Sequence, residues 1–502
     1  MILSNSVFFL TPELVILLAS IGYVFLSALQ KDEQINRTKL FVSSTVLHTV
    51  VLFFLILTVS AIKRSSNGTG VFLFSNSYRI DGFTQFIKII SIFASWVASL
   101  LIVVSKKNIK AELREFLVLV LFTDIAVFVT ASAEHLLVFL IGYQMLALST
   151  LIPAGLQKQA LESSESAVKG YFLEFSVAIL FCLGILILFV HSDSLFISEI
   201  GGLLRSKVME EGSSSVHRAV LWAGVGLIFI PILLRMGLFP FHFNQPDMLQ
   251  GGLTSFGFFY QIQALLTGVV AVVRFGFQIL GKVNGDSWEL LQGLNWTNLL
   301  SMLCAVTLFV GIFLAFQQKN LKRLIGAFFL TQSGFLLFGL VVATKQGVSA
   351  TLLGLLVQVF GILMFILVLQ QLFEKHSENI DSLRGLVWNN PFIGVFLIFL
   401  ILSMIGIPPL VGFSSKMYLL GALIQQKLYW LAALGVLAWV LSMPVFLDVF
   451  RVLIDRRGQG TIHLEKEIIA AILFFLVPCI MVGFYWEPMV SFVHSSLAHV
   501  AW

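Results

Sequence analysis

The chain has 502 residues, of which 58% are hydrophobic and only 11% are charged, and its formal net charge is +5. This composition excludes a water-soluble globular protein and indicates a multi-pass membrane protein. The basic residues are scattered through short segments between apolar runs, which argues against a nucleic-acid-binding surface.

Apolar runs of about 18 or more residues, bounded by polar clusters, predict an all-α protein with fourteen transmembrane helices. The predicted spans are residues 7–29, 40–62, 85–105, 115–133, 136–156, 167–191, 218–240, 254–280, 296–317, 323–344, 348–373, 391–424, 428–453 and 466–486. The loops after the odd-numbered spans contain fifteen lysines and arginines, and the alternate loops contain eight. By the positive-inside rule the first set faces the cytoplasm or matrix, so both termini are expected on the opposite, positive side.

The twelfth predicted span, within residues 390–423, is interrupted by Gly406, Pro408 and Pro409 and then carries Lys416. Each interior proline costs a helix about 3 kcal/mol, and an ammonium at membrane depth costs about 2.5 to 3.5 kcal/mol. We therefore predict a broken helix whose lysine faces a wet interior and marks an ion or proton path. The alternative is a proline kink that serves packing, with Lys416 reaching to an interface.

The seventh predicted span repeats this pattern with Arg235 as its cation. The residues that interrupt it, together with a nearby histidine, are Pro231, Gly237, Pro240 and His242. Two broken helices with a cation, five spans apart, predict two inverted five-helix repeats. The predicted divisions are residues 1–110 (helices 1–3), 111–282 (helices 4–8), 283–457 (helices 9–13) and 458–502 (helix 14 and the tail).

Further ionisable residues lie inside apolar runs: Glu13, His48, Lys88, Asp124, Glu174, Arg274 and Asp448. Asp124 and Glu174 belong to the same half as Arg235, and the sequence is consistent with either structural pairing or transport for each of them. Lys88 and Arg274 lie near span ends and are interpreted as anchors. Glu13 and His48 are assigned to packing or hydrogen bonding.

Four stretches make the chain resemble the antiporter-like membrane subunits of respiratory complex I, the proton-pumping NADH:quinone oxidoreductase. They are RIDGFTQFIKII from Arg79, FPFHFNQPDMLQGG from Phe239, QKNLKRLIGAFFLTQSGF from Gln318 and NPFIGVFLIFLILSMIGIPPLVGFSSKMYLL from Asn390. The likeness covers essentially the whole chain. The lysine that follows GIPPLVGFSS makes it most similar to the subunit N type, called subunit 2 in mitochondria.

The resemblance implies a subunit that moves protons across the mitochondrial inner membrane or the bacterial plasma membrane, coupled to quinone reduction elsewhere in the complex. The implied partners are further antiporter-like membrane subunits, the lipid bilayer and, indirectly, the hydrophilic NADH-oxidising arm. FMN, iron–sulfur clusters and quinone are expected on partner subunits, with no cofactor on this chain. The sequence contains no nucleophile constellation, metal-ligand spacing or nucleotide loop, so no redox active site is predicted in it.

The chain departs from the family where the proton chemistry is expected. Lys416 matches the family's lysine, but Gln144 stands where the fifth span has a glutamate, Arg235 replaces the lysine of the seventh span, and Leu265 replaces the central lysine of the eighth. Gln332 stands where many relatives have a histidine. The candidate proton-pathway residues are Lys416, Arg235, Glu174, Asp124, Gln144, Gln332 and His242, and the candidate helix-break residues are Pro240, Gly406, Pro408 and Pro409.

Three hypotheses follow. In the first, Asp124 or Glu174 supplies the missing carboxylate opposite Arg235, and glutamines and waters carry protons between that pair and Lys416. In the second, the chain is an architectural subunit of complex I with a degenerate proton path. In the third, it belongs to a multi-subunit cation/proton antiporter, which shares the fold and the broken helices.

Overall fold

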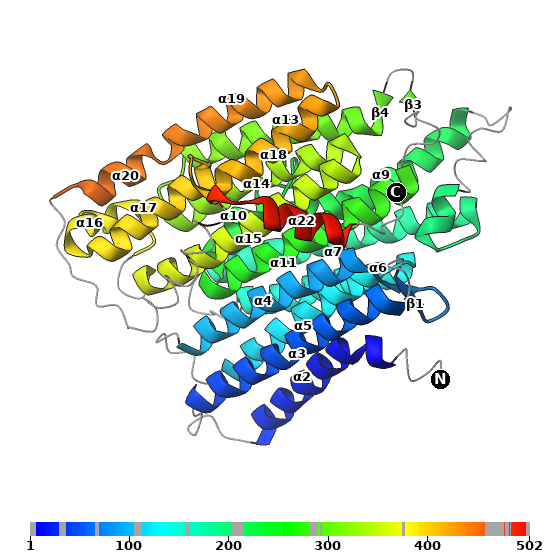
Figure 1. Ribbon diagram of the computed structural model, residues 1–502, viewed down its shortest axis with the longest axis horizontal. Coiled ribbons are helices and arrows are strands. Elements are labelled where there is room, and N and C mark those ends of the chain that lie inside the picture. The colour runs from blue at the N-terminus through cyan, green and yellow to red at the C-terminus, as the bar shows by residue number, and fades with distance from the viewer. Residues whose placement is uncertain are drawn as a thin grey trace.

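The computed structural model describes residues 7–29, 37–65, 70–104, 113–155, 161–202, 215–252, 254–280, 289–291, 294–373, 377–456, 476, 481 and 483–497. In these ranges the chain is nearly all helical (Figure 1). Ten helices of the described part are long and apolar enough to cross a membrane. The chain is therefore a multi-pass membrane protein.

Helices follow one another along the sequence with short connections. The first part of the chain contains α2 (Thr11–Leu29), α3 (Arg37–Ser65), α4 (Gly82–Val104), α5 (Leu113–Ser132), α6 (Leu136–Gly155), α7 (Leu161–Ser192), α9 (Ser215–Met236), α10 (Asn244–Gly251) and α11 (Thr254–Ala271), which continues through the π-helix η2 (Val272–Gly276) into α12 (Phe277–Leu280). The second part contains α13 (Trp296–Phe316), α14 (Leu321–Val342), α15 (Lys345–Phe373), the 3-10 helix η3 (Ile380–Leu383), α16 (Leu386–Asn389), α17 (Pro391–Ile405), α18 (Val411–Gln425), α19 (Tyr429–Val445), α20 (Leu447–Ile454) and α22 (Glu487–Ser496).

Each predicted span coincides with helix except the last, residues 466–486, which lies almost wholly outside the described residues. The predicted span 428–453 coincides with the candidate membrane span Tyr429–Ile454, which is interrupted at Phe446 because α19 ends at Val445 and α20 begins at Leu447. Pro444 lies in the last turn of α19 and offers no N–H for a helical hydrogen bond, which accounts for the interruption.

Two short antiparallel hairpins, β1 (Val71–Leu73) with β2 (Tyr78–Ile80) and β3 (Glu289–Leu291) with β4 (Leu294–Asn295), were not foreseen from the sequence. The first hairpin leads directly into α4. There the Asp81 carboxylate accepts a hydrogen bond of 2.8 Å from the backbone N–H of Thr84, which caps the first turn of the helix.

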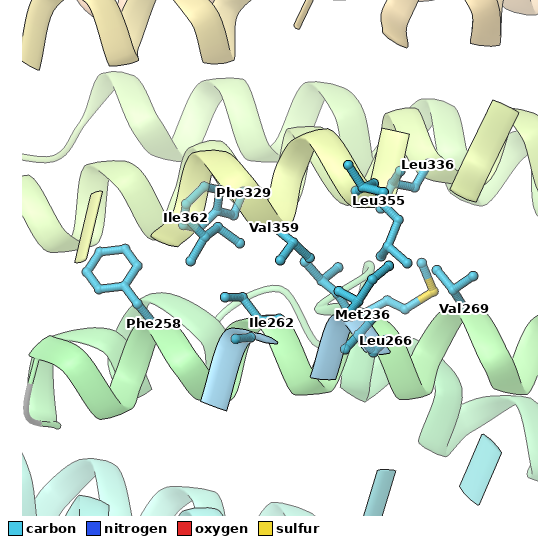
Figure 2. Close-up of a cluster of buried hydrophobic side chains, with 14 of the residues drawn as sticks. Met236, Phe258, Ile262, Leu266, Val269, Phe329, Leu336, Leu355, Val359 and Ile362 are labelled. Carbon is cyan, nitrogen blue, oxygen red and sulfur yellow. The ribbon is translucent and has the colours of Figure 1, made fainter. Parts of the chain in front are cut away.

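The centre of the molecule is formed by α11, α14 and α15, which are buried along almost their whole length. Most of their residues are apolar, as expected of helices enclosed by other helices, and a few buried polar side chains lie among them. Figure 2 shows hydrophobic side chains of α11 facing those of α14 and α15. The labelled members of this layer are Phe258, Ile262, Leu266, Val269, Phe329, Leu336, Leu355, Val359 and Ile362, with Met236 from the end of α9.

Both predicted helix breaks are present, and they share one geometry. α9 ends before Gly237 (φ +66°) and α17 ends before Gly406 (φ +90°), a left-handed conformation that glycine adopts without steric cost. In each case the next residue donates a hydrogen bond five residues back, from Leu238 N to Leu233 O at 2.8 Å and from Ile407 N to Leu402 O at 3.1 Å. These are Schellman terminations, and they leave the chain free to turn into α10 and α18.

Candidate functional site

Lys416 lies in the second turn of α18 and is 2% exposed. Its ammonium donates to the backbone carbonyls of Met404 at 3.2 Å and Ile405 at 2.7 Å, the last carbonyls of the half-helix α17. A helix C-terminus carries a partial negative charge, so the break itself supplies the acceptors for this cation. The predicted break and the predicted lysine therefore form one site.

Aromatic and amide side chains complete the Lys416 site. The ammonium lies 4.8 Å from the ring centroid of Phe335 and 5.7 Å from that of Trp439, within the range of cation–π attraction. Gln332 donates to the same Met404 carbonyl at 3.2 Å. No ion pair joins Lys416 to any carboxylate in the described part of the chain. Its partners are all neutral, so its charge is stabilised only by dipoles and rings.

Arg235, in the last turn of α9, forms the second buried cationic site. Its Nη1 lies 2.9 Å from a carboxylate oxygen of Glu174 on α7 and donates to the Tyr260 hydroxyl at 3.3 Å. Its Nη2 donates to the backbone carbonyl of Tyr143 at 3.0 Å, and the guanidinium carbon lies 4.2 Å from the centroid of the Tyr143 ring. Of the two candidate carboxylates, Glu174 is the one that faces Arg235.

The helix break also serves the Arg235 site. The Tyr143 hydroxyl donates to the carbonyl of Pro231 at 2.7 Å. Gln245 on α10 donates to the carbonyl of Arg235 at 3.3 Å, so the second half of the broken helix holds the end of the first. Tyr143 and Tyr260 were not predicted from the sequence, because aromatic residues are common in membrane helices and give no periodic signal, whereas Gln245 lies in the polar stretch NQPD that follows the interrupted seventh span.

Asp124 lies away from Arg235, in a separate group. Its Oδ1 accepts hydrogen bonds from Ser91 Oγ at 2.7 Å and from Gln263 Nε2 at 3.2 Å, and the side chain is completely buried between α4, α5 and α11. Gln263 lies two residues before Leu265, the position of the family's central lysine. Leu265 is itself buried and apolar.

Within the described ranges, the remaining candidates form no hydrogen bond with Arg235 or Lys416. Gln144 on α6 is partly buried, and its amide nitrogen has no partner among the described residues. His242 lies in the turn between α9 and α10, with its ring stacked on Phe239 at a centroid distance of 5.6 Å. Pro240 lies in this same turn, while Pro408 and Pro409 lie in the turn between α17 and α18.

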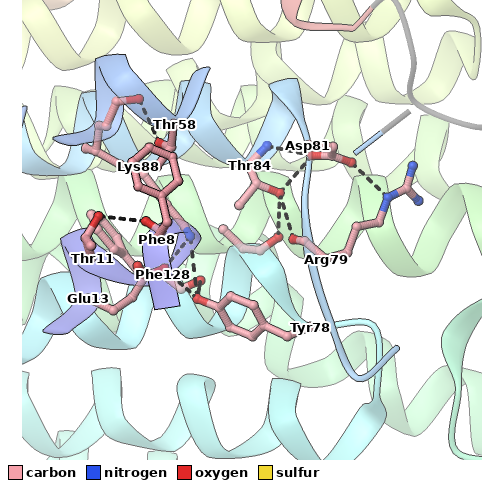
Figure 3. Close-up of polar contacts among 12 residues, drawn as sticks. Phe8, Thr11, Glu13, Thr58, Tyr78, Arg79, Asp81, Thr84, Lys88 and Phe128 are labelled. Carbon is pink, nitrogen blue, oxygen red and sulfur yellow. Dashed lines mark hydrogen bonds and ion pairs between the residues drawn. The ribbon is translucent and has the colours of Figure 1, made fainter. Parts of the chain in front are cut away.

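Two interpretations of charged residues are wrong. Lys88 and Arg274 were expected to be anchors at the ends of spans, but both are buried. Lys88 pairs with Glu13, and Arg274 donates to both oxygens of Asp81 at 3.0 and 2.9 Å (Figure 3 shows Lys88, Glu13 and Asp81). The β1–β2 hairpin and the N-terminal helix cover these positions, which removes the interface that a long side chain would need to reach.

The Asp81 group lies at the start of α4, outside the membrane-spanning segments. Burial would raise the pKa of Asp81, but the positive charges of Arg274 and Arg79 and the hydrogen bonds from Thr84 outweigh it and lower the pKa. Burial raises the pKa of nearby Glu134, although the same two arginines oppose that shift. The described residues include no group of three or more His, Cys, Asp or Glu side chains arranged to hold a metal ion.

A family model described as "NADH:quinone oxidoreductase/Mrp antiporter, TM" matches residues 133–442, more than half of the chain. The chain belongs to this NADH:quinone oxidoreductase/Mrp antiporter family. The matched region begins directly after α5 and reaches α19, so it contains both broken helices with Arg235 and Lys416.

Curated members of the family align with nearly all of the chain. It is 26% identical over 483 residues to the NADH-quinone oxidoreductase subunit N of Pelagibacter ubique, covering 94% of this chain and 96% of the relative. It is 23% identical to the chloroplastic NAD(P)H-quinone oxidoreductase subunit 2 of Mesostigma viride, covering 92% of each. These relatives agree with the resemblance to the subunit N type.

Chains of several solved structures share the fold. Respiratory complex I from Thermus thermophilus matches with a TM-score of 0.75 and 20% identity over 96% of this chain and 99% of its own. A chain of an archaeal membrane-bound sulfane sulfur reductase matches with a TM-score of 0.82 and 18% identity, over 97% of this chain and 96% of its own length. A chain of the Mrp complex of Dietzia sp. matches with a TM-score of 0.76 and 13% identity, over 99% of this chain and 97% of its own length.

Proposed function

We propose that the chain is a membrane-arm, proton-translocating subunit of an NADH:quinone oxidoreductase, coupled to quinone reduction elsewhere in the complex. The observation that carries the proposal is the pair of buried cations, each placed at a helix break inside the matched region. The names of the relatives, NADH-quinone oxidoreductase subunit N and its chloroplastic counterpart, support this assignment over other members of the family.

Lys416 is the residue that gains and loses the proton in this proposal. A lysine enclosed by carbonyls and rings has no counter-ion to hold its charge, so the protonated form depends on charges that approach or retreat nearby. The carbonyls of Met404 and Ile405 accept from the ammonium and orient it. A change in charge at the neighbouring half of the subunit would then drive its protonation and release.

Glu174 is the titratable member of the other site, because the guanidinium of Arg235 stays protonated at physiological pH. Their 2.9 Å contact makes the charge of the pair depend on the protonation of Glu174: neutral when it is ionised and positive when it is protonated. Glu174 thus takes the place of a titrating lysine, with Arg235 as a fixed charge. Asp124 has no part in this pair.

Protons pass between the two sites along glutamines and waters in this proposal. Apolar side chains fill the layer between α11 and α15 shown in Figure 2, so the proposed path runs beside that layer. Buried polar atoms of α11, α14 and α15 lack partners within the described ranges and are places where water binds. These atoms are Gln261 Nε2, Thr331 Oγ1, Ser333 Oγ and both amide atoms of Gln358.

The architecture proposed for the whole chain has fourteen transmembrane helices, with residues 111–282 and 283–457 as inverted five-helix repeats between 1–110 and 458–502. The matching Schellman terminations at Gly237 and Gly406 support the repeat. In both proposed halves, the second part of the broken helix packs against the span that directly precedes the broken helix, α10 against α7 and α18 against α15. Both termini lie on the positive side in this arrangement.

The partners proposed are other membrane subunits of the complex, including further antiporter-like subunits, and indirectly the hydrophilic NADH-oxidising arm. This chain carries no redox centre in the proposal, and FMN, iron–sulfur clusters and quinone belong to partner subunits. The membrane is the mitochondrial inner membrane or the bacterial plasma membrane.

A second candidate function is cation/proton exchange in a multi-subunit antiporter, favoured by the family description and by the match to the Mrp complex of Dietzia sp.. Native membranes that lack this chain distinguish the two. The proposal predicts that NADH:quinone electron transfer and the proton pumping that depends on it are lost, while exchange of sodium for protons in the absence of NADH is unchanged. Loss of exchange with intact NADH-driven pumping would overturn it in favour of the antiporter.

A further inference from the structure

One face of α4 carries a continuous series of polar side chains: Thr84, Lys88, Ser91, Ser95 and Ser99. Spacings of four, three, four and four residues place them on the same side of a helix. All five are 0% exposed. Hydroxyl and ammonium groups buried along a membrane-spanning helix need hydrogen-bond partners, which come from the backbone of the same helix or from the neighbouring helices.

The first part of this series contacts charged groups at the hairpin end of α4. Thr84 Oγ1 lies 2.8 Å from Asp81 and 2.9 Å from Arg274. One turn further, the Lys88 ammonium pairs with Glu13 on α2, whose carboxylate also accepts from the Tyr78 hydroxyl at 2.8 Å. Figure 3 shows Asp81 and Thr84 beside the group of Lys88, Glu13 and Tyr78.

The middle of the series meets Asp124. Ser91 Oγ lies 2.7 Å from Asp124 Oδ1 and 3.0 Å from Gln263 Oε1, so residues of α4, α5 and α11 join in one network. Asp124 has no cation within ion-pair distance in the described ranges. Its second oxygen, Oδ2, is buried and has no partner there. An uncompensated buried carboxylate is costly unless it is protonated or hydrated.

The far part of the series reaches a histidine. Ser99 Oγ lies 2.8 Å from Ser44 Oγ on α3, and Ser44 Oγ lies 3.5 Å from His48 Nδ1. His48 is 2% exposed, and its Nε2 is buried with no partner in the part of the chain that the structure describes. Ser95 lies one turn from Ser91 and one turn from Ser99, and its hydroxyl donates to the Ile92 carbonyl of its own helix at 3.0 Å.

We infer that this α4 polar series, defined as Thr84, Lys88, Ser91, Ser95 and Ser99, forms a second proton track through the N-terminal helices, with Asp124 as its protonatable centre. Hydroxyl groups both donate and accept, so a row of them relays protons between titratable groups once water fills the gaps. The partnerless Oδ2 of Asp124 and Nε2 of His48 are the positions for such water. The inference rests on the proposed function and adds a route that contains neither Lys416 nor Arg235.

A purely structural network makes a different prediction, because its carboxyl keeps one protonation state during turnover. The measurement is the infrared difference spectrum of the intact complex on addition of NADH, together with protons pumped per electron in vesicles. The variants are Asp124→Asn, Asp124→Glu and Ser95→Ala. The control is Asp448→Asn, which removes an exposed carboxylate of α20 paired only with neighbouring Arg451.

The expected result is a carboxylic-acid band that disappears in Asp124→Asn, shifts in Asp124→Glu and persists in Asp448→Asn. Protons pumped per electron fall in Asp124→Asn and recover at least in part in Asp124→Glu, and Ser95→Ala slows pumping although it removes no charge. If the complex with Asp124→Asn does not assemble, the inference is tested by the shifted band in Asp124→Glu and by the slower pumping in Ser95→Ala. A spectrum without an Asp124 band, with pumping unchanged in Ser95→Ala, would refute the track while leaving Lys416 and the proposed function untouched.

Discussion

At the scale of single residues, the two candidate cations differ in what holds them. Arg235 has a carboxylate at 2.9 Å, whereas Lys416 has two carbonyls and two aromatic rings. A fixed ion pair and a lysine without a counter-ion respond differently to a passing proton. The charge of the ion pair changes only when Glu174 gains or loses a proton, whereas the lysine changes charge by gaining or losing the proton on its own amine.

We predict that Glu174→Gln lowers protons pumped per electron and that Glu174→Asp retains part of the pumping. The glutamine keeps the shape but cannot titrate, and it leaves Arg235 buried without a counter-charge, which destabilises the protein by about 3 to 5 kcal/mol. Proton uptake by energised vesicles and thermal denaturation of the purified complex measure the two effects. Equal pumping in Glu174→Gln and the unmodified protein would show that the pair is structural.

Part of the candidate site could be predicted from the sequence. Lys416 was placed at a helix break, because a lysine after two prolines is exceptional in an apolar run. The sequence did not distinguish Asp124 from Glu174 as the partner of Arg235. Glu174 and Arg235 are separated by 61 positions, and such a separation does not reveal which helices face each other. Lys88 and Arg274 were misjudged, because the distance of a residue from the end of a span does not reveal that a hairpin folds over that end.

At the scale of elements, the breaks work because two half-helices approach each other closely. A Cβ on Gly412 of α18 would overlap the backbone carbonyl of Ser403 at the end of α17. Gly406 has φ +90° and a Cβ there would lie 3.1 Å from Lys416 Cδ and 3.2 Å from Trp439 Nε1. Glycine is therefore needed in the turn and in the first turn of the second half-helix.

Gly412→Ala is expected to push α17 away from α18, so that the carbonyls that bind Lys416 move away from it. Both the thermal stability of the complex and its proton pumping should then fall. Gly421→Ala is the matched control on the same helix, since nothing lies within 4 Å of its added Cβ. Alanine there favours the helix by about 0.5 to 1 kcal/mol. Thermal stability of the purified complex and vesicle pumping test both variants, and similar losses in the two would contradict the close-approach explanation.

At the scale of the whole molecule, polar groups tie segments that are distant in sequence. Arg274 of η2 binds Asp81 at the start of α4, across 193 residues, and so fixes the first hairpin to the end of the eighth predicted span. Both side chains are 1% exposed. Removing one partner of a buried ion pair costs far more than the pair contributes, because the other charge remains in a low-dielectric site.

We predict that Asp81→Asn destabilises the chain by about 3 to 5 kcal/mol at neutral pH, measured by thermal denaturation, whereas Asp381→Asn, at an exposed carboxylate, changes little. The arginines lower the pKa of Asp81, so its stabilising effect is complete above the ordinary value of 3.8 and is lost as the pH falls through the folded-state pKa. The difference between Asp81→Asn and the unmodified protein therefore narrows only in acid. A difference that stayed constant from neutral to strongly acidic pH would contradict this assignment.

The most direct test of the central claim is Lys416→Met, assayed for NADH:quinone electron transfer and proton pumping side by side in native membrane vesicles. Lys345→Met, which removes an exposed lysine at the start of α15, is the matched control. The account predicts that Lys416→Met loses both activities while the complex remains intact on a native gel, and that Lys345→Met retains both. Unchanged electron transfer and pumping in Lys416→Met would contradict it and make the chain an architectural subunit.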